Sequence, residues 1–327
     1  MQLDVSILTP VFGDAPYLDE ALESIAQEME VADSQGIEVE TVLVLDRPSF
    51  RVRSRIAAFE DKMPRVWVLE SRNAGLVCAL NLGLSRINSR YVARFDSDDV
   101  MLPGRLSTQM GILDQDPELV LLGGQIQRWS RDKVLSTSAL PLDHSAIIRS
   151  LLRGRHAISH SSCMIRTSTV NDLGGYRTLP HAEDWDLYLR MTEVGRLANT
   201  PHAVTRYRFH AASSTSRNAH LTQQGIQLAI ASHGRAASDS AQPQVGELLE
   251  WRRRARAWLR AKAQVLYRKS LERQSPHARL TLLTASGLLD PGGAITRIRR
   301  DLSLALTGGS WNPTEDRDVR AEAASSQ

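Results

Sequence analysis

Apolar residues in the first hundred positions follow two alternating periodicities. Short apolar runs rich in β-forming residues, typical of buried strands, occupy 3–8, 39–45, 66–69 and 91–95. Between them, at 17–31, 51–60 and 76–88, the patterns predict helices. Thr9-Pro10 is expected to end the first strand. Because strand and helix alternate four times, the pattern predicts an α/β fold whose parallel sheet is covered by helices on both faces.

The alternation is less regular after position 100. Pro103 suits the first turn of a helix. An apolar run at 119–123 is followed by what we expect to be shorter elements. Apolar spacing predicts further helices at 184–194 and 220–232, a linker near 236–244, and helical structure over 246–306.

Composition narrows the class of protein. The chain has 327 residues, 42% of them hydrophobic, and a formal charge of +3, which is too small to argue for a nucleic-acid partner. Two cysteines do not make a disulfide framework, so a reducing compartment is expected. The first residues do not resemble a signal peptide, and no apolar run approaches the roughly 20 residues that span a bilayer. We therefore expect a soluble, cytoplasmic protein.

Three carboxylates, Asp96, Asp98 and Asp99, follow the fourth predicted strand. Their mutual repulsion would be relieved by a divalent cation, and carboxylate oxygens suit Mg²⁺ or Mn²⁺. Mg²⁺ is usually held by one or two carboxylates together with substrate phosphates, so such a site indicates a phosphate-bearing ligand. The alternative is an acidic helix N-terminus before Pro103.

Other candidate residues lie further along the chain or end other strands. Glu183 and Asp184 open a predicted helix, where an acid either stabilises the first turn or serves as a base. His210 is either a structural or exposed histidine or a ligand that completes a metal shell. Asp46 and Asn73 end strand-like segments, where they could be simple turn residues.

The order of the motifs resembles one known family. In sequence they are Thr9-Pro10-Val11-Phe12, Leu45-Asp46, Asn73-Ala74-Gly75-Leu76, Ala79-Leu80-Asn81, Arg94 to Asp99, Pro103 to Gln109, His160, Gly174-Gly175-Tyr176, Glu183-Asp184 and Tyr207-Arg208-Phe209-His210. Together they closely resemble the inverting family 2 glycosyltransferases, particularly bacterial members that build capsular and exopolysaccharide repeat units. The resemblance covers residues 3 to about 215.

This resemblance implies a domain organisation. Residues 1–215 would form a single Rossmann-like, A-type nucleotide-diphospho-sugar transferase domain with a mainly parallel central sheet. A helical C-terminal extension would follow over 216–307, and 308–327 would be a disordered tail.

The resemblance also implies a role for each matching residue. Thr9 and Asp46 would line the nucleotide base with Pro10, Asn73 would support base and ribose, and Asp96, with Ser97 beside it, would contact the ribose. Asp98 would be the principal metal ligand, and His210 would reach the metal or the diphosphate. Asp184 would be the catalytic base, with Glu183 beside it near the acceptor.

The implied activity is metal-dependent, inverting, hexosyltransferase-type sugar transfer in cell-surface polysaccharide biosynthesis. A nucleotide-diphosphate sugar, expected to be a UDP-sugar, would donate to a hydroxyl of a saccharide or lipid-linked acceptor, with Mn²⁺ or Mg²⁺ as cofactor. One departure concerns the base site: family members often carry Asp-Asp-Gly-Ser after the second strand, whereas this chain has Leu45-Asp46-Arg47-Pro48-Ser49. Arg47 either contacts the nucleotide or lies in solvent.

Two other functions are consistent with parts of the pattern. A sugar nucleotidyltransferase would carry a Gly-rich basic loop after the first strand, but residues 9–14 hold one glycine and no basic residue. A catalytically silent nucleotide-sugar-binding module is disfavoured by the joint presence of Asp98, Asp184 and His210. A dinucleotide dehydrogenase is excluded because no GxGxxG follows the first strand.

Residues 250–273 predict a basic amphipathic helix, with nine Arg or Lys against two Glu. Such a helix either packs its apolar side on the catalytic domain or lies on an anionic membrane surface. The second interpretation would place the protein peripherally at the inner face of the cell membrane. It fits because acceptors for polysaccharide assembly are commonly lipid-linked in relatives.

Overall fold

The computed structural model describes residues 2–72, 75–130, 133–208 and 218–233, together with Ala263 and Leu266. The predicted linker, nearly all of the basic helix and the predicted tail lie outside the described residues. The boundaries expected at 215 and 307 therefore remain predictions.

The first half of the chain follows the predicted alternation of strands and helices. Its elements are β1 (Val5–Phe12), α1 (Leu18–Ser34), β2 (Val39–Asp46), α2 (Phe50–Glu60), β3 (Val66–Glu70), α3 (Leu76–Arg86) and β4 (Tyr91–Arg94). Strand β2 is buried along its whole length, as expected for a strand covered on both faces.

The second half contains shorter helices and two long strands. Its elements are β5 (Val100–Met101), α4 (Arg105–Gln115), β6 (Leu119–Ser130), β7 (Lys133–Thr137), α5 (His144–Leu152), the 3₁₀ helix η1 (His160–Ser162), β8 (Met164–Arg166), α6 (Thr167–Asp172), α7 (Glu183–Met191), β9 (Arg196–Arg208) and α9 (Ala219–Ser232). The helices predicted after Pro103, at 184–194 and at 220–232 are confirmed as α4, α7 and α9.

The described strands form one sheet in the order β3-β2-β1-β4-β8-β6-β9-β5, with β7 paired to β6. Strands β3, β2, β1 and β4 are mutually parallel, and β6 is parallel to β9. Antiparallel β8 joins these two parallel groups. The predicted fold class, a Rossmann-like α/β domain with a mainly parallel central sheet, is confirmed.

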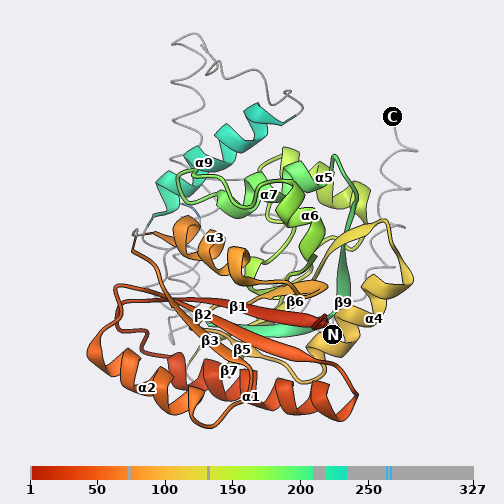
Figure 1. Cartoon of the computed structure of the whole chain (residues 1–327). Coiled ribbons are helices and arrows are strands. Elements are labelled where there is room, and N and C mark those ends of the chain that lie inside the picture. The colour runs from red at the N-terminus through yellow and green to blue at the C-terminus, as the bar shows by residue number, and fades with distance from the viewer. Residues whose placement is uncertain are drawn as a thin grey trace, which may run out of the picture.

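Helices cover both faces of the sheet (Figure 1), and a hydrophobic core lies on each face. One contains Ile7 and Leu43 with residues of α1, α2 and α4, and the other contains Leu8 and Val42 with residues of α3, α5, α7 and α9. Successive residues of one strand point to opposite faces, so neighbours such as Ile7 and Leu8 belong to different cores. Because helices cover both faces of the sheet, the side chains on both faces are buried. Each central strand therefore appears in the sequence as a continuous apolar run.

Thr9-Pro10 does not end the first strand, contrary to our prediction. Strand β1 continues to Phe12, and β2 pairs with it throughout. Strand β4 pairs with β1 only as far as Leu8, whose carbonyl oxygen accepts from Phe95 N. Residues two apart face the same neighbour, so the N–H that Pro10 lacks would have pointed toward β4 after β4 has turned away. The strand therefore loses no ladder hydrogen bond at Pro10.

The expectation of short elements after 119–123 is also corrected, because β6 and β9 are the longest strands described, with 12 and 13 residues. Close packing explains their inconspicuous sequence. A Cβ on Gly123 would lie 2.2 Å from Asn199 Oδ1, and one on Gly124 would lie 2.6 Å from a Val204 methyl group. Small residues are therefore required where an apolar run would otherwise signal a strand.

Among the described helices, none has both the length and the apolar character needed to cross a membrane.

Candidate active site

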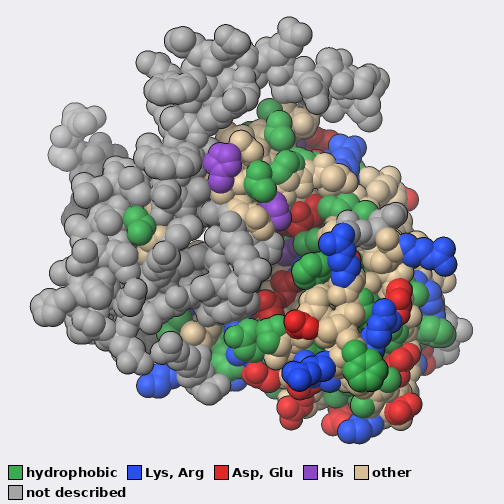
Figure 2. Space-filling model, turned by 90° about the vertical axis from the view of Figure 1, so that its left-hand side faces the viewer, with side chains coloured by type: hydrophobic (Ala, Val, Ile, Leu, Met, Phe, Trp, Pro, Cys, Tyr) green, Lys and Arg blue, Asp and Glu red, His purple; other side chains and the backbone are tan. Residues whose placement is uncertain are grey.

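The polar residues predicted at strand ends meet at one edge of the sheet. Strands β1, β2 and β4 are parallel, so the loops after Phe12, Asp46 and Arg94 leave the same edge. Figure 2 shows the corresponding face, where acidic side chains form a patch with histidine side chains beside it. Ligands of open parallel sheets bind at this edge.

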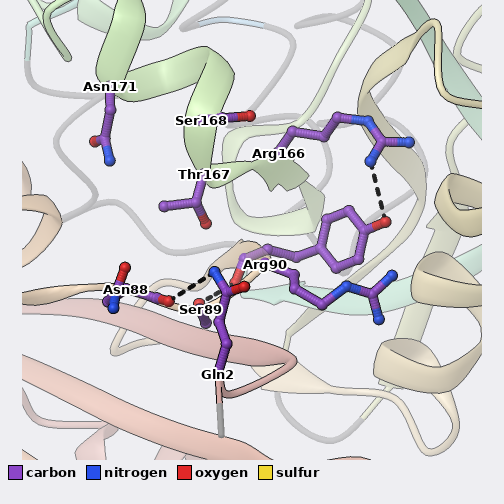
Figure 3. Close-up of a pocket in the computed structure, with 9 residues that line it drawn as sticks. Gln2, Asn88, Ser89, Arg90, Arg166, Thr167, Ser168 and Asn171 are labelled. Carbon is purple, nitrogen blue, oxygen red and sulfur yellow. Dashed lines mark hydrogen bonds between the residues drawn. The ribbon is translucent and has the colours of Figure 1, made fainter.

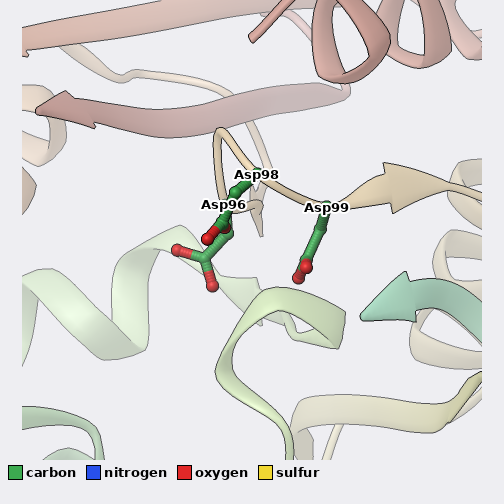
Figure 4. A group of neighbouring side chains, drawn as sticks. All are labelled: Asp96, Asp98 and Asp99. Atoms are coloured by element: carbon green, nitrogen blue, oxygen red, sulfur yellow. The ribbon is translucent and has the colours of Figure 1, made fainter. Parts of the chain in front are cut away.

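The acidic cluster follows β4. Asp96, Asp98 and Asp99 each place a carboxylate oxygen within 4.8 Å of the other two (Figure 4). Asp99 is 1% exposed; its Oδ1 accepts from Arg208 N at 2.9 Å, and its Oδ2 is buried without a well-formed hydrogen bond, although the Ser161 hydroxyl lowers the pKa of this carboxyl. These donors leave the repulsion among the three carboxylates in place, and a divalent cation would relieve it. The cluster therefore fits a Mg²⁺ or Mn²⁺ ion.

Electrostatics at the cluster point the same way. Burial raises the pKa of Asp99 well above its usual range, and the charges of Asp98 and Asp96 raise it further. Burial and Asp98 also raise the pKa of Asp96, while the nearby Arg94 guanidinium opposes this. Without an added positive charge, this site resists full ionisation of its carboxyls.

The second acidic pair, Glu183 and Asp184, opens α7. Glu183 is buried, which raises its pKa, and Asp184 is partly buried. Burial, followed by repulsion from Glu183, raises the pKa of Asp184 to about 7. Asp184 Oδ1 accepts from Trp185 N at 2.8 Å, which favours the charged form. Asp184 therefore combines the helix-terminus role with a titration near neutral pH.

Arg94 links the two acidic groups. It is 2% exposed at the end of β4, and its Nη1 lies 2.5 Å from Asp96 Oδ2. Its charge lowers the pKa values of both Glu183 and Asp184. We assigned Arg94 no role from the sequence, although an arginine within the apolar strand YVARF is the signal that could have identified it.

A neutral histidine and two tyrosines border the same space. His160 Nε2 lies 2.8 Å from the Tyr176 hydroxyl, and burial together with Arg94 holds the pKa of His160 well below its usual range. Tyr188 lies one helical turn after Asp184, and its hydroxyl is 3.5 Å from Cys163 Sγ. These three side chains can form hydrogen bonds but are uncharged. The two tyrosines interact electrostatically with Asp184, and His160 contacts both of their rings.

The predicted nucleotide-base site shows unsatisfied polar atoms. Asp46 is 4% exposed; its Oδ2 accepts from Gly75 N at 2.7 Å, and its Oδ1 is buried with no partner among the described residues. Thr9 is fully buried, and its Oγ1 likewise has no hydrogen-bond partner among the described residues. Pro10 and Ser97 are partly buried at the same edge. An acceptor such as Asp46 Oδ1 can receive an N–H from a ligand.

Arg47 occupies the position where family members often carry glycine, and its φ of 51° lies in the left-handed region. A side chain is unfavourable in this conformation, which glycine adopts freely. Arg47 is exposed in the structure. Arg47 in place of glycine therefore keeps the turn conformation but makes the backbone strained at this position.

The motif from Pro103 to Gln109 forms contacts that stabilise the end of β4, from which the acidic loop begins. Arg105 is buried and donates to the carbonyl oxygens of Arg94, Cys163 and Ser161 at 2.8–3.1 Å. Glu28 of α1 accepts from Gly104 N and Leu106 N, both at 2.7 Å, at the start of α4. These contacts explain a motif that our sequence analysis noted without a function: it holds the end of β4 in place.

The structure thus brings Thr9, Pro10, Asp46, Asp96, Ser97 and Asp98 to one edge of the sheet, and Arg94 connects this edge electrostatically with Glu183 and Asp184. Asn73 and His210 lie outside the described residues, so their predicted roles remain predictions. A separate hollow of about 330 Å³ lies at the opposite, amino end of β1 and β4 (Figure 3). It contains none of the predicted site residues, and its Arg166 donates to the Tyr91 hydroxyl at 3.2 Å.

Comparison with known proteins shows the family to which the chain belongs. The profile of "Glycosyl transferase family 2" matches residues 6–174. The amylovoran biosynthesis glycosyltransferase AmsE of Erwinia amylovora is 32% identical over 193 residues, which cover 58% of this chain and 70% of that protein. An uncharacterized glycosyltransferase of Haemophilus influenzae is 29% identical over 62% of this chain and 73% of its own. The chain belongs to glycosyltransferase family 2.

Solved structures support the fold. S. aureus TarS 1–349 in complex with UDP-GlcNAc has a TM-score of 0.53 at 14% identity, covering 90% of this chain and 92% of TarS 1–349. The mannosyltransferase PcManGT from Pyrobaculum calidifontis, in complex with GDP-Man and Mn²⁺, has a TM-score of 0.51 at 17% identity. It covers 99% of this chain and 80% of PcManGT. At these identities the similarity establishes the architecture.

Proposed function

We propose that the protein is an inverting, divalent-cation-dependent glycosyltransferase that moves one sugar from a nucleotide diphosphate to an acceptor hydroxyl. The observation that carries the proposal is the arrangement of two acidic groups around Arg94. One group, Asp96 to Asp99, fits a cation, and the other supplies a carboxyl, Asp184, whose pKa is about 7. A cation site and a base close to neutral pH are what sugar transfer from a diphosphate needs.

Asp184 would act as the general base. Its carboxylate takes the proton of the acceptor hydroxyl while the oxygen forms a bond to the anomeric carbon. The bond from that carbon to the diphosphate oxygen breaks on the opposite face, and its electron pair leaves with the nucleotide diphosphate. This single displacement inverts the anomeric configuration. Glu183, buried beside the base, would lie on the acceptor side.

Asp98 would hold the cation with the neighbouring carboxylates and His210. When bound, the Mn²⁺ or Mg²⁺ ion would neutralise negative charge that develops on the leaving diphosphate. Arg94 would keep Asp96 ionised and directed toward the cluster, since its guanidinium lies 2.5 Å from that carboxylate.

The nucleotide would occupy the adjacent strand ends. Asp46 Oδ1 would accept from the imide N–H of a uracil base, with Thr9, Pro10 and Asn73 around the base and ribose and Asp96 and Ser97 beside the sugar. The buried, unpaired Asp46 Oδ1 supports this assignment. Structurally similar proteins have been solved in complex with UDP, UDP-GlcNAc and GDP-Man. Uracil, through N3–H, and guanine, through N1–H, both present a donor to the acceptor atom at Asp46, and we propose a UDP-sugar on the family resemblance.

We further propose a role in cell-surface polysaccharide biosynthesis, supported by the similarity to the amylovoran biosynthesis enzyme. The acceptor would be a saccharide or lipid-linked hydroxyl. The protein would work in the cytoplasm, reaching the inner face of the cell membrane through residues 250–273.

Calorimetric titration with UDP tests this proposal. Wild-type protein should bind UDP with Mn²⁺ and lose most of that affinity in EDTA, and Asp98→Asn should resemble the EDTA condition even with Mn²⁺ present. Asp114→Asn is a matched control, because Asp114 pairs with Arg90 and Tyr91 at the opposite end of β4. Equal UDP affinity under all conditions would contradict the cation site. If the protein binds UDP but releases sugar from none of the UDP-sugars tested, it is a catalytically silent nucleotide-sugar-binding module.

A further inference from the structure

Arg208 ends β9 beside the acidic loop and contacts two of its residues. Its backbone N–H donates to Asp99 Oδ1 at 2.9 Å, and its Nε donates to the carbonyl oxygen of Asp98 at 3.0 Å. No role was assigned to Arg208 in the sequence, where it precedes His210 by two positions.

The guanidinium of Arg208 is itself held on several sides. Its Cζ lies 4.1 Å from the ring centroid of Tyr17 and 4.1 Å from that of Trp129. Its Nη2 donates to Glu20 Oε2 at 2.6 Å, and the side chain is 8% exposed. Tyr17 and Glu20 belong to the start of α1, and Trp129 belongs to β6. Arg208 therefore ties the acidic loop to two separate parts of the fold.

We infer that Arg208 is a positioning residue that holds the acidic loop in the geometry that binds a divalent cation. This inference rests on the proposed function. The three carboxyl groups, whose oxygens lie within 4.8 Å of one another, repel each other as they ionise, and this repulsion opposes the geometry that a cation needs. Fixing the main chain at Asp98 and one oxygen of Asp99 keeps the remaining oxygens directed to a common point. Groups behind metal ligands typically contribute about 10–100-fold to metal affinity.

The chemistry requires arginine at this position. A planar guanidinium can stack between two rings while its edge nitrogens donate in two directions, to Glu20 and to Asp98. The single ammonium group of lysine would keep the charge but could not fill both donor positions from between the rings. Arg208→Lys therefore separates the positioning role from charge alone.

Arg166 provides a matched control for general destabilisation. Its Cζ also lies over an aromatic ring, 5.4 Å from the centroid of Tyr91, and its nitrogens donate to the backbone oxygens of Leu119 and Asp116 at 2.8 and 3.0 Å. It pairs with the start of β4, whereas the acidic loop follows the end of that strand. Arg166→Lys should lower the unfolding temperature without changing the cation site.

The decisive experiment is titration of the metal-free full chain with Mn²⁺, with free Mn²⁺ measured by electron paramagnetic resonance. We expect Arg208→Lys to raise the Mn²⁺ Kd by about 10–100-fold and Arg166→Lys to leave it within about twofold. An unchanged Kd in Arg208→Lys, or an equal increase in both variants, would overturn the inference. Absence of Mn²⁺ binding by the wild-type protein would instead overturn the proposed function.

A milder variant covers the case in which Arg208→Lys does not fold. Glu20 is half exposed, with 47% of its side chain accessible, so Glu20→Gln perturbs the core little. It removes the charged partner that orients the guanidinium. We expect a smaller increase in the Mn²⁺ Kd, in the same direction. If Arg208→Lys cannot be folded, an unchanged Kd in Glu20→Gln overturns the inference.

Discussion

Replacing Asp184 by asparagine should make the protein less active and, above neutral pH, more stable. The folded-state pKa of Asp184 is about 7, against an ordinary value of 3.8, because of burial and the charge of Glu183. The folded protein therefore binds this proton more tightly than the unfolded chain does. The contribution of this proton to the unfolding free energy is greatest below the pKa of the unfolded state, and it is lost as the pH rises through the pKa of the folded state. The two pH units between 5 and 7 correspond to roughly 3 kcal/mol.

Asp184→Asn removes this titration while its side-chain oxygen can still accept from Trp185 N. The difference in unfolding free energy between the variant and the wild type should be roughly 3 kcal/mol more favourable to the variant at pH 8 than at pH 5. Urea unfolding of both proteins in EDTA, followed by tryptophan fluorescence at the two pH values, measures this difference. Asp186→Asn is the control on the same helix. It should lose stability at both pH values, since it leaves Arg190 buried without its carboxylate at 2.8 Å.

The same substitution should lower sugar transfer by roughly 10²–10⁴-fold, the usual effect of losing a general base. Donor affinity should stay near the wild-type value. The wild-type rate should fall about tenfold per pH unit below pH 7 as Asp184 takes up a proton. Other titratable or charged groups whose electrostatics couple to Asp184 are Glu183, Arg94, Cys163, Tyr176 and Tyr188. A stability difference independent of pH, together with full activity, would refute both the burial argument and the base assignment.

Three other predictions address nucleotide binding, backbone strain and membranes. Asp46→Asn replaces one acceptor oxygen with a donor and should weaken UDP binding by about 10–100-fold by calorimetry, since hydrogen bonds to charged groups contribute about 1.5–3 kcal/mol; unchanged affinity would contradict the base contact. Arg47→Gly should raise the unfolding free energy by about 0.5–1 kcal/mol by relieving the left-handed φ, with UDP affinity changed less than about twofold if the side chain lies in solvent. If residues 250–273 meet lipid, the protein should co-sediment with anionic liposomes at low salt and release at high salt, and neutralising Arg252, Arg253 and Arg254 should weaken sedimentation. Failure to sediment at low salt would favour packing of this segment on the catalytic domain.

The first half of the fold was predictable because its signals are local. Strands covered on both faces read as continuous apolar runs, and amphipathic helices repeat every three to four residues, so β1 to β4 and α1 to α3 were identified with small errors at their ends. The acidic run could be recognised for the same reason, since its carboxylates are neighbours in sequence. The edge of the sheet they share with Asp46 followed from the parallel arrangement alone.

Long-range contacts decided the parts that the sequence did not predict. Strands β6 and β9 pair residues that lie nearly eighty positions apart in the sequence, and the two glycines of β6 are explained by the side chains of β9 that face them. Pro10 interrupts the local strand signal, yet it is tolerated because β4 has already turned away at Leu8.

The site shows the same division. The amino-acid sequence determined which chemical groups are available, namely the carboxylates of the acidic run and of α7. The tertiary structure decided their surroundings, because the pKa of Asp184 near 7 comes from burial and neighbouring charges. It also placed Arg94 between the acidic groups and Arg208 against the backbone of Asp98, 110 residues away in sequence. Burial and contacts across the fold depend on how distant segments pack, and this information is not carried by local residue patterns.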